Sequence, residues 1–343
     1  MRKIYWLNFI IFLIIGNTFA QSAREMGYES YKKAEYESAI QYLAAVTKTN
    51  PTDSEAWNIL GMSYLNLSKF KESHKAFEKA IKQNPQEVKF QINMAYCSLL
   101  SNKLGNAEKE IKQAILLDSK NATAFYIRGL VFLWNGKFDD AIADANQSLS
   151  LDKSVGVVYL LKSNAYLYKF GQEVLKNGSF PDNVEFLQKA VEVLENCAVN
   201  CHQTSFLTTN QKKLDELKVF YQYFDKKKGE EIGSYNSQKS INATNMATSS
   251  INNPTEQPLN ILSKPKPSYT DSARQAGVQG TITLAVLFSA DGKTKIILPL
   301  KPLSNGLTEE AVKAALQIQF SPPTKDGKPI SVVKMLQYTF SLY

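Results

Sequence analysis

Two consecutive blocks of apolar residues at helical spacing precede Pro85 in the sequence. Residues three or four positions apart share one face of a helix, so each block predicts an amphipathic helix. Pro85 cannot continue a helix because it lacks a backbone N–H. Gly61 is small enough to let the second helix lie against the first. The pattern consists of Trp57, Leu60, Gly61 and Tyr64 in the first block and Phe70, Ser73, Phe77 and Ala80 in the second.

This helical hairpin recurs along the chain every 34 residues. Counted from Trp57, the period reaches Gln91, Phe125 and Tyr159. One hairpin cannot bury its apolar face alone, but stacked copies form a continuous core and a superhelix with a concave surface. The period resembles that of a tetratricopeptide repeat array. About four repeats are predicted in an array over 22–155, at residues 22–53, 54–87, 88–121 and 122–155.

The pattern fades in a fifth copy. It starts with Tyr159 and Ser163 but is lost at Phe170, where a second helix is due. Residues 156–228 are therefore predicted to hold a degenerate repeat and helices that cap the array. From 229 to 257 the chain is rich in Ser, Asn, Thr and Gln and poor in large apolar residues, which is typical of a flexible linker.

Beyond the linker the apolar period changes from helical to alternating. Alternation before and after the turn at Asp291-Gly292 predicts a β-hairpin. Thr308 is the expected N-cap of a helix, with Glu309 and Glu310 in the first turn, where the helix dipole favours carboxylates. The alternating residues are Ile282, Leu284, Val286 and Phe288 in the first strand, Ile296, Leu298 and Leu300 in the second, and the inward-facing Leu336, Tyr338, Phe340 and Leu342 in a last strand.

Six short motifs follow one another over residues 258–343. They are Lys264 to Tyr269, Ala273 to Gly280, Asp291-Gly292, Gly306-Leu307-Thr308, Phe320 to Pro323 and Asp326 to Pro329. Their types and order resemble the TonB C-terminal domain. The resemblance implies a three-stranded antiparallel sheet with helices on one face, in the periplasm, that docks onto outer-membrane transporters by strand addition. The expected fold class is thus multidomain, an all-α superhelix followed by a small α+β domain.

The chain departs from the energy transducers of this family. Those proteins have a membrane span with a motor-contacting His and a long Pro-rich segment. Here the apolar segment from Ile4 to Ile15 contains no His, and the linker is rich in Asn and Ser. We therefore expect partner docking but no force transmission.

The first residues predict export. A short basic start is followed by the apolar run from Ile4 to Ile15 and by a small residue at Ala20. Because the run is shorter than the roughly 18 residues of a membrane span, residues 1–20 are predicted to be a secretory signal peptide. We expect cleavage before Gln21 and a periplasmic mature chain. An uncleaved segment would instead anchor the chain in the inner membrane.

The chain has three cysteines and two histidines. Cys197 and Cys201 are close enough in sequence to pair in an oxidising compartment, and Cys97 is expected to be a buried apolar residue. Cys197, Cys201 and His202 also resemble a haem-attachment motif with one residue too many, so a haem-bearing electron carrier is a remote alternative. His74 is the only other histidine, which leaves little material for a metal site or a catalytic triad. We expect no cofactor, no metal and no enzymatic activity.

The concave surface of a repeat array is formed by first-helix side chains that point away from the second helices. Aromatic anchors with interspersed Asn residues suit the capture of a protein or peptide. In the alternative, the helices within 183–227 fold back and bury these side chains. The candidate partner-binding residues are Asn58, Met62, Asn66, Tyr96, Tyr126, Leu130, Trp134, Asn164 and Tyr168.

The C-terminal sheet is expected to have two different edges. Pro299 removes a ladder donor from the second strand of the hairpin, which places that strand at an edge. The last strand is then the other edge and can accept an added strand. The alternative is an edge covered by the linker or by dimerisation. The candidate residues that face outward there are Met335, Gln337, Thr339 and Ser341.

Together these features predict a protein–protein interaction adapter. The repeats bind one protein, and the TonB-like domain docks another, such as an outer-membrane TonB-dependent transporter. A cell-envelope assembly scaffold without transporter contact is the alternative. The formal net charge of +8 does not indicate nucleic acid, because an exported protein does not meet it. Membrane association is expected only through an uncleaved N-terminal segment.

Overall fold

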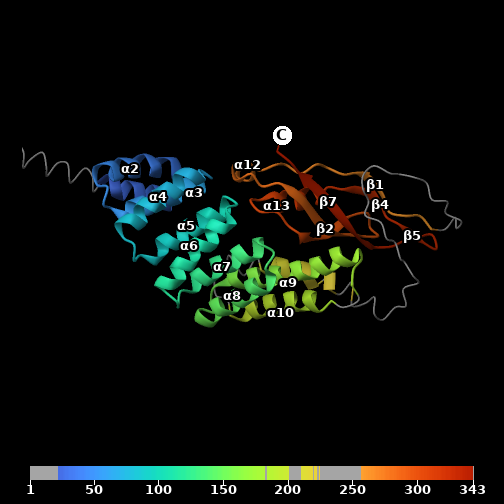
Figure 1. The fold of residues 1–343 in the computed structure, drawn as a ribbon. Helices are drawn as coiled ribbons and strands as arrows, with labels where there is room; N and C mark the ends of the chain where they lie inside the picture. Colours follow the sequence, from blue (N-terminus) through green and yellow to red (C-terminus); the bar gives the residue numbers. More distant parts are fainter. Residues whose placement is uncertain are drawn as a thin grey trace, which may run out of the picture. The chain divides into compact units, whose positions relative to one another are not determined.

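The computed structural model describes residues 22–181, 184–200, 210–218, 220–221, 224 and 256–342 (Figure 1). These residues belong to two compact units, which meet in sequence between Ile127 and Arg128. The predicted signal peptide and Cys201 lie outside the described residues. So does the predicted linker, apart from its last two positions.

The first unit is built from helical hairpins. A helix over residues 22–32 pairs with α2 (Tyr36–Thr49), and the chain continues through α3 (Ser54–Asn66), α4 (Phe70–Gln83), α5 (Val88–Leu100), α6 (Leu104–Leu117) and the start of α7 (Ala122–Trp134). The first helices α3, α5 and α7 each have 13 residues and begin 34 residues apart. The predicted period is therefore confirmed as a structural period.

One left-handed residue joins the two helices of each hairpin. Ala34, Ser68, Asn102 and Gly136, again 34 residues apart, have φ angles of 59°, 56°, 59° and 72°. The next residue then closes the helix end; for example, the Lys69 N–H donates to the Tyr64 carbonyl at 2.9 Å. This Schellman-type closure satisfies orphan carbonyls and reverses the chain within one turn.

Gly61 provides the close helix approach that its small size predicts. A Cβ at this position would lie 2.7 Å from Cε1 of Phe77 on α4, closer than real Cβ contacts allow. Ser73 of the same helix donates its hydroxyl hydrogen to the Gly61 carbonyl at 2.8 Å. Phe77 is fully buried as a result, and it anchors the hairpin core.

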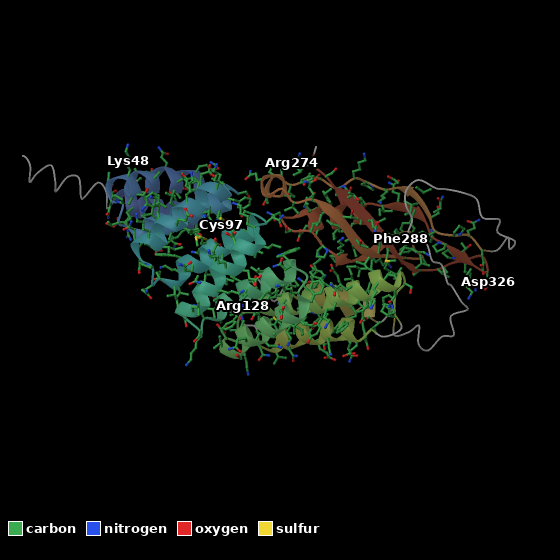
Figure 2. All side chains as sticks on the ribbon, viewed as in Figure 1. Lys48, Cys97, Arg128, Arg274, Phe288 and Asp326 are labelled. Atoms are coloured by element: carbon green, nitrogen blue, oxygen red, sulfur yellow. The ribbon has the colours of Figure 1, made fainter. Side chains whose placement is uncertain are left out.

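The second unit continues with α8 (Phe138–Leu151), α9 (Gly156–Asn177), α10 (Glu185–Asn200) and a helix within 210–221. Arg128 pairs with Asp144 of α8 through two bonds of 2.8 and 2.7 Å (Arg128 is labelled in Figure 2). Phe170 stands where the left-handed turn residue is due, 34 positions after Gly136. It is buried, and α9 runs straight through it for 22 residues.

The C-terminal part is a small α+β domain, so the predicted fold class is confirmed. Its three-stranded antiparallel sheet has the order β3 (Thr294–Lys301), β2 (Gly280–Phe288), β7 (Val332–Phe340). The helices are α12 (Asp271–Ala276) and α13 (Leu307–Leu316). Short pairs β1 (Asn260–Ser263) with β4 (Gln319–Ser321) and β5 (Thr324–Lys325) with β6 (Lys328–Pro329) complete it.

The main core of this domain lies between the sheet and α13. All four predicted inward residues of β2 contribute to it, and so do Leu336, Tyr338 and Phe340 of β7. In β3, however, the core residue is Ile297, which pairs with Val286. Leu298 pairs with Ala285 and faces the opposite side. Both faces of β3 are apolar, so alternation alone could not show which face meets the core.

The expected role of Thr308 is wrong. The N-cap of α13 is Gly306, at φ 80°, without a side-chain cap. The Thr308 hydroxyl instead donates to the Leu303 carbonyl at 2.7 Å and accepts from the Leu303 N–H at 2.9 Å. This hydroxyl holds the loop before the helix, because Leu303 lies outside any strand or helix and both of its backbone groups bond to Thr308.

The two described cysteines differ. Cys197 is disulfide-bonded, and its predicted partner lies outside the described residues. Cys97 is free and buried (Figure 2), where burial raises its pKa to about 11. A thiol held in a disulfide cannot form the thioether of an attached haem, which argues against the haem alternative.

Candidate interaction surfaces

Four predicted partner-binding residues lie on the first helices of the first unit. Met62 on α3, Tyr96 on α5 and Tyr126 on α7 are half-buried, and Asn66 is exposed. We call these four residues the first-helix wall. Their partial exposure on successive helices is the arrangement that a repeat array offers to an extended partner.

Asn58, also predicted for this surface, is buried at 3% exposure. Its amide oxygen accepts from Nδ2 of Asn93 at 2.8 Å, and its own Nδ2 donates to Glu55 at 3.4 Å. Glu55 is also paired with Lys89 at 2.9 Å. Asn58 therefore joins α3 to α5, and the half-buried Asn93, which sequence reasoning missed, is its partner.

The two tyrosines of the first-helix wall lie close enough for the Tyr96 phenol to affect the pKa of Tyr126. Burial raises the pKa of Tyr126 to about 12, and the nearby Tyr96 phenol adds to this rise. Burial likewise raises the pKa of Tyr96. Both phenols therefore stay neutral near pH 7, and they supply an apolar surface with a polar rim.

The remaining predicted residues of this set belong to the second unit. Leu130, Trp134 and Asn164 are half-buried there. Tyr168 is 7% exposed, and its ring centroid lies 5.9 Å from that of Phe138. Burial and the neighbouring Glu309 raise its pKa. Tyr168 is thus already in contact with its own chain.

The β7 edge carries the second predicted surface. Gln337 and Thr339 are exposed, as is Ser341 just beyond the strand, and Met335 is half-buried. Both β3 and β7 are edge strands, as Pro299 predicted.

One backbone carbonyl shows which groups of β7 face its outer edge. Lys264 donates from Nζ to the carbonyl of Gln337 at 2.8 Å. In an antiparallel strand, the backbone groups of alternate residues point to opposite sides. Gln337 and Thr339 therefore present their N–H and C=O groups away from β2, whereas Tyr338 bonds to β2.

Lys264 was not predicted for this surface. Its ammonium lies 4.7 Å from the ring centroid of Tyr338, and burial lowers its pKa. The sequence places Lys264 in the first TonB-like motif, but only the fold brings it to β7.

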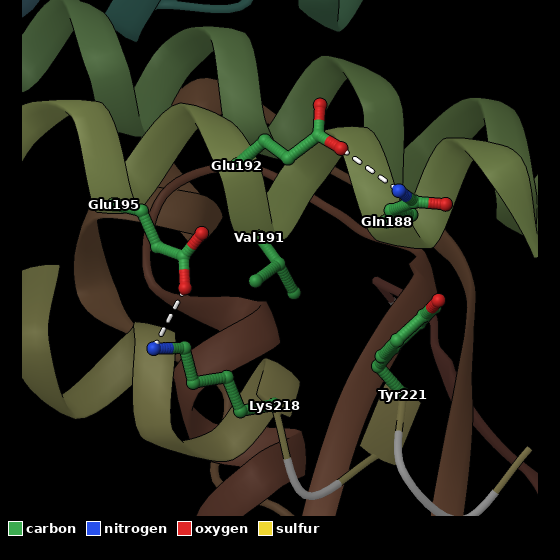
Figure 3. Close-up of a pocket in the computed structure, with 6 residues that line it drawn as sticks. All are labelled: Gln188, Val191, Glu192, Glu195, Lys218 and Tyr221. Atoms are coloured by element: carbon green, nitrogen blue, oxygen red, sulfur yellow. Dashed lines mark hydrogen bonds and ion pairs between the residues drawn. The ribbon is translucent and has the colours of Figure 1, made fainter. Parts of the chain in front are cut away.

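A surface pocket lies between α10 and the helix within 210–221 (Figure 3). At its rim Lys218 pairs with Glu195 at 2.8 Å, and Gln188 donates to Glu192 at 2.9 Å. Val191 and Tyr221 supply its apolar lining. These groups satisfy one another and include no nucleophile paired with a base, so the pocket does not indicate catalysis.

Within the described ranges, no three His, Cys, Asp or Glu side chains come together as metal ligands. No helix in that part of the chain is long and apolar enough to cross a bilayer.

Family models match both parts of the chain. A model described as the Gram-negative bacterial TonB protein C-terminal matches residues 265–342. Two tetratricopeptide repeat models match residues 54–87 and 101–154. The β7 edge thus belongs to the TonB-type match, and part of the first-helix wall to the repeat matches.

Individual proteins and solved structures are similar to parts of this chain. The STIP1 homolog of Dictyostelium discoideum is 24% identical over 182 residues, covering 51% of this chain and 29% of that protein. The peroxisomal targeting signal receptor of Candida glabrata is 31% identical over 74 residues, covering 22% of this chain and 12% of the receptor. The chain thus spans less than a third of these relatives. The solved structure of a thermophilic TPR protein from Thermus thermophilus shows 17% identity and a TM-score of 0.47, covering 58% of this chain and 99% of that one.

Proposed function

Because the chain carries tetratricopeptide repeats followed by a TonB C-terminal domain, we propose that it is a periplasmic adapter between two proteins. The repeats bind the first protein through the first-helix wall of the first unit, and Leu130, Trp134 and Asn164 are further candidate contacts in the second unit. The C-terminal domain binds the second protein at the β7 edge. Residues 1–20 act as the export signal.

The outer edge of β7 carries this proposal. Gln337 and Thr339 combine exposed side chains with backbone donors and acceptors that point away from β2. An extended segment added there gains main-chain hydrogen bonds, and the outward side chains give it specificity. A periplasmic segment of an outer-membrane TonB-dependent transporter is the partner of this kind that the domain type favours.

Lys264 is the group that such a segment displaces. Its bond to the Gln337 carbonyl is a single contact from a flexible side chain, with the ammonium 4.7 Å above the Tyr338 ring. A carbonyl occupied by one lysine exchanges for a backbone N–H at little cost. Lys264 therefore keeps the edge from pairing with other edges while it stays open to its own partner.

Proline substitutions at two neighbouring positions of β7 test whether the partner binds at this edge. Gln337→Pro removes an N–H that faces outward, so partner binding weakens while the sheet stays folded. Gln337→Ala keeps the N–H and serves as the matched control. Tyr338→Pro removes an N–H from the pairing with β2 and is expected to lower the melting temperature. If Gln337→Pro melts and binds like the parent, the partner does not use this edge.

Crosslinking in cells identifies the partner. A photo-reactive residue at Thr339 should form adducts with a TonB-dependent transporter, whereas the same group at the exposed Ala143 on α8 should not. Adducts at Thr339 that contain only other envelope proteins would contradict transporter docking. That outcome would favour the assembly scaffold.

A further inference from the structure

Strands β2 and β3 of the three-stranded sheet are buried on both faces. On the face away from α13, Thr283, Ala285 and Leu287 of β2 are at most 6% exposed. Leu298 and Leu300 of β3 are at most 2% exposed. An antiparallel sheet covered on one side has a polar outer face, but four of these five residues are apolar. This second face of the sheet therefore needs a covering element.

Helix α9 covers the β3 side of this face. It packs against β3 within the second unit. A Cβ at Gly171 would lie 2.3 Å from the Leu300 carbonyl oxygen and 2.8 Å from its Cα. No side chain fits at those distances, so the approach depends on glycine. Tyr168 and Val174, three positions to either side, share this helix face and are buried.

The part of α9 that contacts β3 exists because the fifth repeat lacks the left-handed turn that ends the other first helices. First helices α3, α5 and α7 stop after 13 residues, whereas α9 continues for 22. The position that holds Ala, Ser, Asn or Gly in the left-handed turns holds Phe170, for which that conformation is costly. Gly171 and Val174 lie in the extension that results.

We propose that the β3 side of the second face of the C-terminal sheet is an interaction surface whose partner is α9 of the same chain, and that the C-terminal domain thereby covers the extended end of α9. The domain contacts the extension of α9 at Gly171, whereas α10 packs along α9 in the place of a second helix, with the Ser163 hydroxyl donating to the Ala190 carbonyl at 2.9 Å. A protein that binds the C-terminal domain is then excluded from the β3 side, where α9 lies, whereas the β7 edge stays accessible.

Two glycine-to-alanine variants test the contact. Alanine favours a helix over glycine, so Gly105→Ala on α6, where a Cβ meets nothing within 4 Å, should leave the melting temperature equal or higher. Gly171→Ala should lower it instead, and should speed amide exchange in β3 by roughly tenfold while residues 54–117 stay unchanged. A rise in melting temperature with Gly171→Ala, or unchanged exchange in β3, would overturn the proposal.

A variant on the sheet side tests the same contact through its effect on α9. Leu300→Ala removes apolar surface from the second face without touching α9. If the contact forms, amide exchange rises in residues 167–175 of α9, whereas Lys301→Ala, at an exposed neighbour, has no such effect. This readout also decides the question if the Gly171→Ala chain does not fold. Unchanged exchange in α9 would show that the sheet is not docked there.

Discussion

The imidazole of His74 on α4 lies 3.1 Å from a carboxylate oxygen of Glu110 on α6, joined by a hydrogen bond through Nε2. Glu78, one turn further along α4, lies 3.4 Å from Nδ1. Glu110 is only 11% exposed. The second helices of two successive repeats are thus linked by a titratable pair.

This pair predicts a pH-dependent stability. The hydrogen bond to Glu110 raises the pKa of His74 above its ordinary value of 6.5, and this outweighs the lowering by burial. The stabilisation is fully present below the unfolded-state pKa and is lost as pH rises through the higher folded-state pKa. Urea unfolding at a series of pH values should show the free energy of unfolding falling over this window. His74→Gln should flatten the fall, and parallel curves for the two chains would contradict the role of the pair.

The left-handed turns predict two opposite changes in stability. Ser68→Gly should raise the free energy of unfolding by about 1 kcal/mol, because a non-glycine residue pays for a positive φ. Gly136→Ser should lower it by a similar amount. A Cβ at Gly136 meets nothing within 4 Å, so the loss there comes from the backbone alone. Chemical denaturation measures both, and equal signs for the two variants would refute the explanation.

The first-helix wall predicts a loss of binding without a loss of helix. Tyr96→Ala with Tyr126→Ala should weaken binding to the partner of the repeats by roughly 30-fold or more, since interface energy concentrates in aromatic anchors. Tyr96→Phe with Tyr126→Phe keeps both rings and is the matched control. Circular dichroism checks the helices, and binding is measured with the protein that the parent chain captures from envelope extract. If the alanine pair instead unfolds the array, the two rings belong to its core.

The Thr308 hydroxyl predicts a local cost in the C-terminal domain. Thr308→Val keeps the shape of the side chain but leaves the N–H and carbonyl of Leu303 without their partner. The loss should be about 1 to 2 kcal/mol in the free energy of unfolding. Thr308→Ser retains the hydroxyl and should lose less. Equal losses for the two variants would assign the effect to packing rather than to hydrogen bonding.

Some residue roles could be predicted because they depend on near neighbours. Gly61 could be assigned to a close helix approach, since a helix pair repeated at fixed spacing needs a small residue there. Pro299 could be assigned to an edge, since it cannot donate to a ladder. Gln337 and Thr339 follow from alternation along one strand.

Other residues could not be found in this way. Asn93 and Lys264 act through partners that are distant in the sequence, Asn58 and the Gln337 carbonyl. Thr308 has the residue type and the position of an N-cap, but the helix starts one residue before it. Tyr168 has the spacing of a surface residue and is buried. The role of each of these residues depends on the three-dimensional course of the chain, which local sequence patterns do not give.

The sequence by itself determined the 34-residue hairpin, the change to alternating strands and the order of the two parts. These features depend on side-chain periodicity and on backbone preferences within a few residues. Only the tertiary structure decided that α9 meets β3 at Gly171 and Leu300. Strands that are apolar on both faces require a cover, but the sequence pattern cannot say which helix provides it. That choice depends on how closely two distant backbones can approach, and here a single missing Cβ allows it.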